Sequence, residues 1–311
     1  MSILKIRKAQ REGARVLIGL AGVSGSGKTY TALKLAQGLA KGKAGKVGLL
    51  DTENRRGSLY ADILGEPFLI GDLLPPFSPE RYVEAIREFA DAGVDVLVVD
   101  SMSHEWEGTG GCDDIAQAER NPVVGWKKAK LAHKSMMNAL LQSPMDVIVC
   151  LRAREKVDFS DPKAPRSLGV QPICEKNFLF EMTASLLMEQ SGERQTVLKC
   201  PADLVSILGR GHGFLSESDG ADIRHWIDGG KPVSASLKRA RDVLEASCEQ
   251  GIAALKSAWE ATPATVKKQL GGTTFLESLK SSAEAFDLAS KPDRVPSSVA
   301  QFQQEVEDGG I

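Results

Sequence analysis

The chain has 311 residues, of which 42% are hydrophobic, so it can bury the core of one large domain with a small one, or of two medium domains. Lys and Arg total 39 against 41 Asp and Glu, and this balance excludes a basic field over the whole molecule. Any nucleic-acid site must therefore be a local patch.

The sequence patterns lead us to expect neither export nor membrane insertion. Residues 1–14 form a basic leader that lacks the apolar stretch of a secretory signal, and no apolar run approaches the ~20 residues of a membrane helix. The five cysteines are scattered without a Cys-x-x-Cys pair, which argues against disulfides or a zinc ribbon, and the four histidines show no metal-ligand spacing. We expect a cytoplasmic protein without a membrane partner.

Strand and helix patterns alternate from residue 15 to about residue 190. Helices are expected from Lys28, from Pro79 after the N-cap Ser78, and from about Pro122. The expected strands cover residues 16–21, 47–50, 94–99, 146–151 and 184–188. This alternation predicts an α/β fold with a mainly parallel sheet flanked by helices.

The composition changes near residues 229–232, and only helical patterns follow. We therefore predict three parts, namely the leader at 1–14, an ATPase core at 15–230 and a helical C-terminal region with a loose tail at 231–311.

The stretch GVSGSGKTY follows an expected strand and opens an expected helix, which is the setting of a P-loop. Glycines let backbone N–H groups surround the β-phosphate of ATP, the lysine reaches the β- and γ-phosphates, and the threonine hydroxyl ligates Mg²⁺. The predicted nucleotide-binding residues are Gly22, Val23, Ser24, Gly25, Ser26, Gly27, Lys28, Thr29 and Tyr30.

Three side chains beyond neighbouring strand ends are candidates for catalysis with Lys28. Asp100 ends the run VDVLVVD, where it would hold Mg²⁺ together with Thr29; the alternative is a turn-forming Asp. Glu53 is the candidate base that activates water, unless it pairs with a neighbouring arginine at 55 or 56. Arg152 follows the fourth strand and is a candidate sensor of the γ-phosphate, unless its loop is simply solvated.

These motifs together resemble the RecA-type recombinase core. A P-loop, then LLDTEN, then VLVVDSMSHEW reproduce that order, with Ser101 where an AAA+ enzyme would carry Glu. Residues 15–190 are similar to the short RecA-like ATP-binding proteins of tailed phages, an AAA-type group that includes single-strand annealing recombinases. The resemblance implies a RecA-like P-loop NTPase that hydrolyses ATP with Mg²⁺, binds single-stranded DNA and forms a homo-oligomeric ring or filament in the host cytoplasm.

The resemblance also places two DNA-binding loops, at residues 105–121 and 156–174. The first is acidic and therefore a poor contact for phosphates. The second offers Lys156, Lys163 and Arg166, and its Pro/Gly content suggests a mobile loop. Trp126 beside several lysines would add a stacking platform, unless it belongs to the core and the lysines form a solvated face.

The resemblance further implies a cation donated to the next subunit, for which Lys176 and Arg166 are the candidates. A single-strand-binding protein is an expected partner. Two rival functions stay open at this point: a kinase that phosphorylates a small molecule or nucleotide under an arginine-rich lid, and a switch that binds ATP without hydrolysing it.

Overall fold

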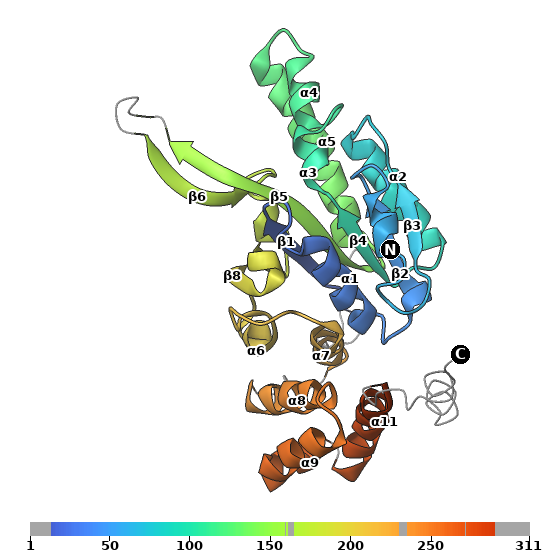
Figure 1. Cartoon of the computed structure of the whole chain (residues 1–311). Helices are drawn as coiled ribbons and strands as arrows, with labels where there is room; N and C mark the ends of the chain where they lie inside the picture. Colours follow the sequence, from blue (N-terminus) through green and yellow to red (C-terminus); the bar gives the residue numbers. More distant parts are fainter. Residues whose placement is uncertain (1–13, 159, 161–164, 230–234, 271, 290–311) are drawn as a thin grey trace, which may run out of the picture. The chain divides into compact units, whose positions relative to one another are not determined.

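The computed structural model describes residues 14–158, 160, 165–229, 235–270 and 272–289. The chain divides into two compact units, Met1–Pro232 and Val233–Ile311 (Figure 1). Almost all of the predicted leader, the tail beyond residue 289 and the candidate Lys163 lie outside the described residues.

A mixed, mainly parallel sheet forms the centre of the first unit. Its order is β3-β2-β4-β5-β1-β7-β8, with β6 paired to β5; only the pairs β5–β6 and β7–β8 are antiparallel. The strands are β1 Leu17–Gly22, β2 Val47–Asp51, β3 Leu69–Asp72, β4 Val96–Asp100, β5 Asp146–Asp158, β6 Arg166–Pro172, β7 Ala184–Glu189 and β8 Arg194–Lys199. The α/β fold with a mainly parallel sheet that was predicted from the sequence is confirmed.

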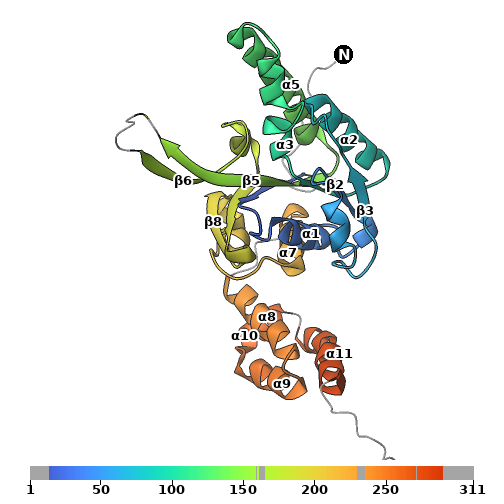
Figure 2. The ribbon, with the colours of Figure 1, turned by 45° about the horizontal axis from the view of Figure 1, so that its top comes forward.

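Helices cover both faces of this sheet (Figure 2). One core joins the sheet to α1 and α7, and the other joins it to α2 and α5. The helices of the unit are α1 Lys28–Leu39, α2 Pro79–Asp91, α3 Ser103–Glu107, α4 Cys112–Gln117, α5 Pro122–Gln142, α6 Val205–Leu208 and α7 Glu217–Ile227. Because both faces are covered, β1, β2 and β4 are buried at every residue, as their unbroken apolar runs predict.

The structure differs from the sequence prediction at several places, and the helices α6 and α7 were not predicted. The edge strands β3 and β8 were not predicted, because most of their side chains are exposed and neither has a buried apolar run. The predicted loop at 105–121 contains the end of α3 and all of α4. The predicted loop at 156–174 is largely an antiparallel hairpin, in which β5 runs on to Asp158 and pairs with β6. This hairpin projects from the sheet as an arm (Figure 1).

The second unit is helical in its described part. It comprises α8 Ala235–Cys248, α9 Ile252–Ala261, α10 Ala264–Gln269 and α11 Thr273–Ala289, around a core centred on Leu244 and Leu255. Within the described ranges of the whole chain, no helix is long and apolar enough to cross a membrane.

Helices α1 and α7 approach each other closely enough to require glycine on both sides. A Cβ added to Gly38 would lie 1.9 Å from the carbonyl oxygen of Glu217, and one added to Gly220 would lie 2.1 Å from that of Leu35. Gly38→Ala should therefore force the helices apart and lower the free energy of unfolding by about 1–3 kcal/mol, measured by urea titration. Gly45→Ala is the control, because a Cβ there meets open space. Equal stability of the two variants would contradict this packing.

Candidate active site

Strand register places four chain segments at one edge of the sheet. Asp51 of β2 is opposite Asp100 of β4, and Asp100 is opposite Cys150 of β5. Gly22, at the end of β1, is opposite Arg152 of β5. The carboxyl ends of these parallel strands therefore meet at the P-loop, where α/β sheets bind ligands.

The P-loop has the backbone shape that a phosphate cradle needs. Gly25 and Gly27 have φ values of 77° and 81°, a region that side chains disfavour. A Cβ at Gly22 would lie 2.3 Å from Ser26 Oγ. Lys28 Nζ donates to the carbonyl oxygen of Gly22 at 2.9 Å and to the next carbonyl at 2.8 Å, so the lysine folds back over its own loop.

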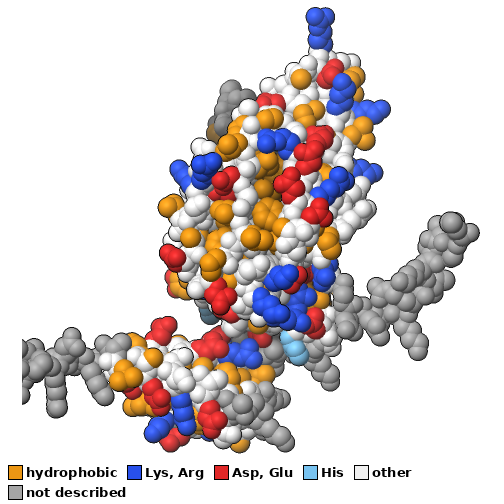
Figure 3. Space-filling model, turned by 90° about the vertical axis from the view of Figure 1, so that its right-hand side faces the viewer, with side chains coloured by type: hydrophobic (Ala, Val, Ile, Leu, Met, Phe, Trp, Pro, Cys, Tyr) orange, Lys and Arg blue, Asp and Glu red, His pale blue; other side chains and the backbone are white. Residues whose placement is uncertain are grey.

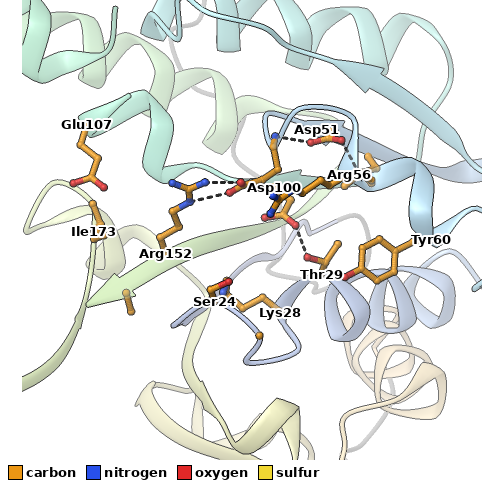
Figure 4. A pocket seen from close by; sticks show the side chains of 15 residues that line it. Ser24, Lys28, Thr29, Asp51, Arg56, Tyr60, Asp100, Glu107, Arg152 and Ile173 are labelled. Atoms are coloured by element: carbon orange, nitrogen blue, oxygen red, sulfur yellow. Dashed lines mark hydrogen bonds and ion pairs between the residues drawn. The ribbon is translucent and has the colours of Figure 1, made fainter. Parts of the chain in front are cut away.

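The two predicted magnesium-binding oxygens lie together beside this loop. Thr29 Oγ1 donates to Asp100 Oδ2 at 2.5 Å. Burial raises the pKa of Asp100, and the Thr29 hydrogen bond only partly offsets this. A buried carboxylate and a hydroxyl, both hard oxygen donors, fit Mg²⁺. A cavity of about 540 Å³ opens over them (Figure 4).

Asp51 shapes the loop that carries Glu53. Its Oδ1 accepts the backbone N–H of Glu53 at 2.6 Å, and its Oδ2 accepts that of Gly57 at 2.7 Å. Asp51 is only 2% exposed. Both of its oxygens are thus occupied by the loop, so Asp51 positions Glu53 at the cavity.

Glu53 and Arg152 both line the cavity and form a two-point ion pair. Arg152 Nε donates to Glu53 Oε1 at 2.9 Å, and Nη2 donates to Oε2. Burial by itself would raise the pKa of Glu53, but the hydrogen bond and charge of Arg152 bring it below its usual value. The alternative considered for Glu53, an ion pair with Arg55 or Arg56, is not found among the described residues, and Arg55 Nε lies 3.2 Å from Asp72.

Helix α3 is tied to the same site by hydroxyl groups. Ser103 Oγ accepts the backbone N–H of Arg152 at 2.9 Å. Thr52 Oγ1 accepts the N–H of Ser101 at 2.7 Å and lies 2.7 Å from His104 Nδ1. Burial and the nearby charge of Arg152 lower the pKa of His104, so the ring is neutral near pH 7. Thr52 therefore connects His104 of α3 to the loop after β2.

The structure brings most of the predicted site residues to one cavity. Those that line it are Ser24, Gly25, Lys28, Thr29, Glu53, Asp100 and Arg152. The predicted residues Val23 and Tyr30 are exposed and are not among the lining residues, while Ser26 is buried beneath the loop. Lining residues that the sequence analysis did not assign are Leu49, Arg56, Gly57, Tyr60, Glu107, Ala153 and Ile173. Arg56 and Tyr60 lie in the segment just after LLDTEN, and this closeness in sequence is the signal that could have found them.

The candidate DNA and subunit contacts lie elsewhere. Lys156 and Arg166 are exposed on the arm, and Lys176 is exposed after it. Trp126 is 39% exposed with its ring 5.8 Å from that of Trp106, so it is not the core residue of the alternative interpretation. Trp126 lines a shallow groove along α5 whose other lining residues are Pro122, Val123, Lys127, Lys130, Leu131 and Lys134.

Comparison with known proteins matches the AAA domain family to residues 14–183. The signal recognition particle 54 kDa protein of Thermococcus gammatolerans is 36% identical over 112 residues, which are 34% of this chain and 25% of that protein. Its Thermococcus kodakarensis counterpart is 33% identical over 101 residues, 31% of this chain and 22% of that protein. The chain spans about a quarter of the length of these curated relatives. A crystal structure of a KaiC-like protein from Pyrococcus horikoshii OT3 aligns with a TM-score of 0.38 at 16% identity, covering 61% of this chain and 81% of that one.

The ion pair across the cavity predicts the titration of Glu53. Its pKa, followed by carboxyl ¹³C NMR, should lie below the usual value in the wild type and rise in Arg152→Ala, because burial then acts without compensation. The pair therefore stabilises the fold at neutral pH, and this contribution is lost as the pH falls through the folded-state pKa. Arg55→Ala, which removes the partner of Asp72, should leave Glu53 unchanged. A pKa that does not move in Arg152→Ala would exclude the pair in solution.

Proposed function

The chain belongs to the AAA domain family, and on that premise we propose that it is a magnesium-dependent ATPase that transfers the γ-phosphate of ATP to water. One observation carries the proposal: Lys28, Glu53 and Asp100 line a single cavity although they come from three separate segments. A P-loop alone holds a nucleotide, whereas a carboxylate opposite it supplies a base for hydrolysis.

The P-loop and the oxygens beside it would hold the substrate and its cation. Lys28 leaves the carbonyls of its own loop and contacts the β- and γ-phosphates. Thr29 and Asp100 would hold Mg²⁺, which when bound neutralises charge on the phosphates.

Glu53 acts as the general base in this proposal. Its pKa is low, so it is a carboxylate at neutral pH, but both of its oxygens are engaged by Arg152. The γ-phosphate carries more negative charge than Glu53 and is the stronger partner for Arg152. When the Arg152 side chain moves from Glu53 to the γ-phosphate, the Glu53 carboxylate becomes free to accept a proton from water. Arg152 would then stabilise the negative charge on the γ-phosphate while this group is transferred to water.

We further propose that this ATPase binds single-stranded DNA and promotes annealing or recombination, as in the phage proteins it resembles. Figure 3 shows acidic and basic side chains interspersed on one face of the molecule. Such a face offers DNA no broad basic surface, so we propose that DNA binds at local clusters of cations. The arm carries exposed Lys156 and Arg166. The α5 groove combines Trp126 with three lysines at its rim, which suits stacking of bases beside phosphates.

A ring or filament of this chain is part of the proposal. Arg166 and Lys176 are exposed and would be the cations donated to a neighbouring subunit. A single-strand-binding protein would deliver the DNA. The Glu53–Arg152 ion pair also favours a second candidate function. If Glu53 stays paired it cannot accept a proton from water, and the protein would be a switch that binds ATP and Mg²⁺ without turnover.

Phosphate release without any added acceptor separates the candidates. Wild type should release phosphate from ATP, Lys28→Ala should lose nucleotide binding, and Glu53→Gln should keep binding while turnover falls by about 100-fold or more. Glu84→Gln, on the exposed side of α2, is the matched control and should behave as wild type. ATP binding without phosphate release in the wild type would favour the switch, and release that requires an acceptor would favour a kinase.

DNA binding is tested by salt dependence. The double variant Lys156→Ala/Arg166→Ala should bind an oligothymidylate more weakly, and its plot of log affinity against log salt should be shallower by roughly one to two units. Arg87→Ala/Lys256→Ala removes two exposed cations elsewhere and should leave both quantities unchanged. If the two double variants changed the affinity and the salt dependence equally, the arm would not be part of the DNA interface.

A further inference from the structure

A second cluster of reactive side chains lies outside the ATP cavity, where α3, α4 and α5 pack together (Figure 1). Glu105 of α3, Cys112 of α4 and His133 of α5 are buried, with exposed fractions of 1%, 0% and 7%. One ligand atom from each lies within 4.8 Å of the other two. None of the three has a role in the proposed hydrolysis.

The charge of Glu105 has no basic partner besides the histidine. Its Oε1 lies 3.2 Å from Cys112 Sγ, and both of its oxygens lie 3.1 Å from His133 Nδ1. Among the described residues, no lysine or arginine pairs with it. A carboxylate removed from water needs a positive partner, because its desolvation costs several kcal/mol by order of magnitude. Glu105 begins the acidic segment 105–121 that was predicted as a loop, but it is 1% exposed and is therefore not one of that segment's solvated charges.

We propose that Glu105, Cys112 and His133 bind a zinc ion. The three ligand types are those of structural and catalytic zinc sites, and the thiol and imidazole disfavour magnesium and calcium. Zinc–ligand bonds of about 2.0–2.3 Å place the ligand atoms of a tetrahedral site about 3.3–3.6 Å apart. The distances from Glu105 to Cys112 Sγ and to His133 Nδ1, 3.2 and 3.1 Å, are close to this range. The fourth position would be filled by water.

The surroundings suit a cation. The rings of Trp106 and Phe178 lie 5.7 and 5.8 Å from that of His133 and form apolar walls. An apolar shell around a charged ligand set raises metal affinity by excluding water.

The zinc would hold α3 at the nucleotide site. Ser103, His104 and Glu107 of the same short helix contact Arg152, Thr52 and the ATP cavity respectively. Five residues do not form a stable helix alone, so fixing Glu105 to two other helices would order the whole segment. The site lies in the first unit and does not depend on the proposed hydrolysis.

Metal content and cobalt spectra of the full chain test the proposal. Apo protein given one equivalent of Zn²⁺ should retain one zinc per chain after gel filtration and melt at a higher temperature. Co²⁺ in its place should show the charge-transfer band of a thiolate ligand. Cys112→Ser should lose that band, and Cys112→Ser and His133→Gln should each weaken zinc binding by at least about tenfold.

Two controls separate this site from adventitious binding. Cys200→Ser and His225→Gln alter a thiol and an imidazole remote in sequence, and should retain zinc and the cobalt band. If the Cys112 and His133 variants do not fold, the presence or absence of the thiolate charge-transfer band in the cobalt-loaded wild type decides whether Cys112 binds the metal. A wild type with no thiolate band, or cluster variants that keep full zinc affinity, would overturn the proposal and leave a hydrogen-bonded triad.

Discussion

The register of four parallel strands is the constraint on which the candidate site depends. Asp51 lies opposite Asp100, and Gly22 lies opposite Arg152. The P-loop, the acidic ends of β2 and β4, and Arg152 of β5 therefore meet at one edge of the sheet. A shift of one residue in β4 would turn Asp100 to the other face of the sheet and away from Thr29. Full burial of these apolar strands on both faces makes such a shift costly.

The Glu53–Arg152 pair is strong enough to set a resting state and weak enough to exchange. Arg152 is 44% exposed, and ion pairs with so much solvent contribute on the order of 1 kcal/mol or less. A triphosphate with its several charges exceeds that contribution. Asp51 and Ser103, in contrast, hold the backbones of Glu53 and Arg152 with short hydrogen bonds. The backbone is therefore fixed while the two side chains can change partners.

The sequence predicts the parts of the site that are local or lie at strand ends. Lys28 and Thr29 belong to one contiguous motif, and Asp100 ends a run too apolar to be anything but a buried strand. The position of Glu53 was predicted, but its partner was not, because Arg152 is 99 residues away and meets it only through the register of the sheet. Arg55 was the nearer candidate, yet it has a φ of 64° and pairs with Asp72.

Longer-range features left no periodic signal. The sequence of the hairpin arm contains proline and glycine and is typical of a loop. The side chains of β6 are exposed on both faces, so its sequence does not alternate between apolar and polar residues. Glu105, Cys112 and His133 come from three helices with irregular spacing, so only tertiary packing brings them together. The edge strand β3 is four residues long and mostly exposed, which leaves too little hydrophobic pattern to detect.

A crystal structure of the full chain with Mg²⁺ and a non-hydrolysable ATP analogue tests the central claim most directly. The account predicts the γ-phosphate in the cavity between Lys28 and Arg152, the cation at Thr29 and Asp100, and the Glu53 carboxylate released from Arg152 and within hydrogen-bond distance of a water beside the γ-phosphate. A nucleotide bound at another edge of the sheet, or a Glu53 that stays paired with Arg152 and remote from the γ-phosphate, would contradict it.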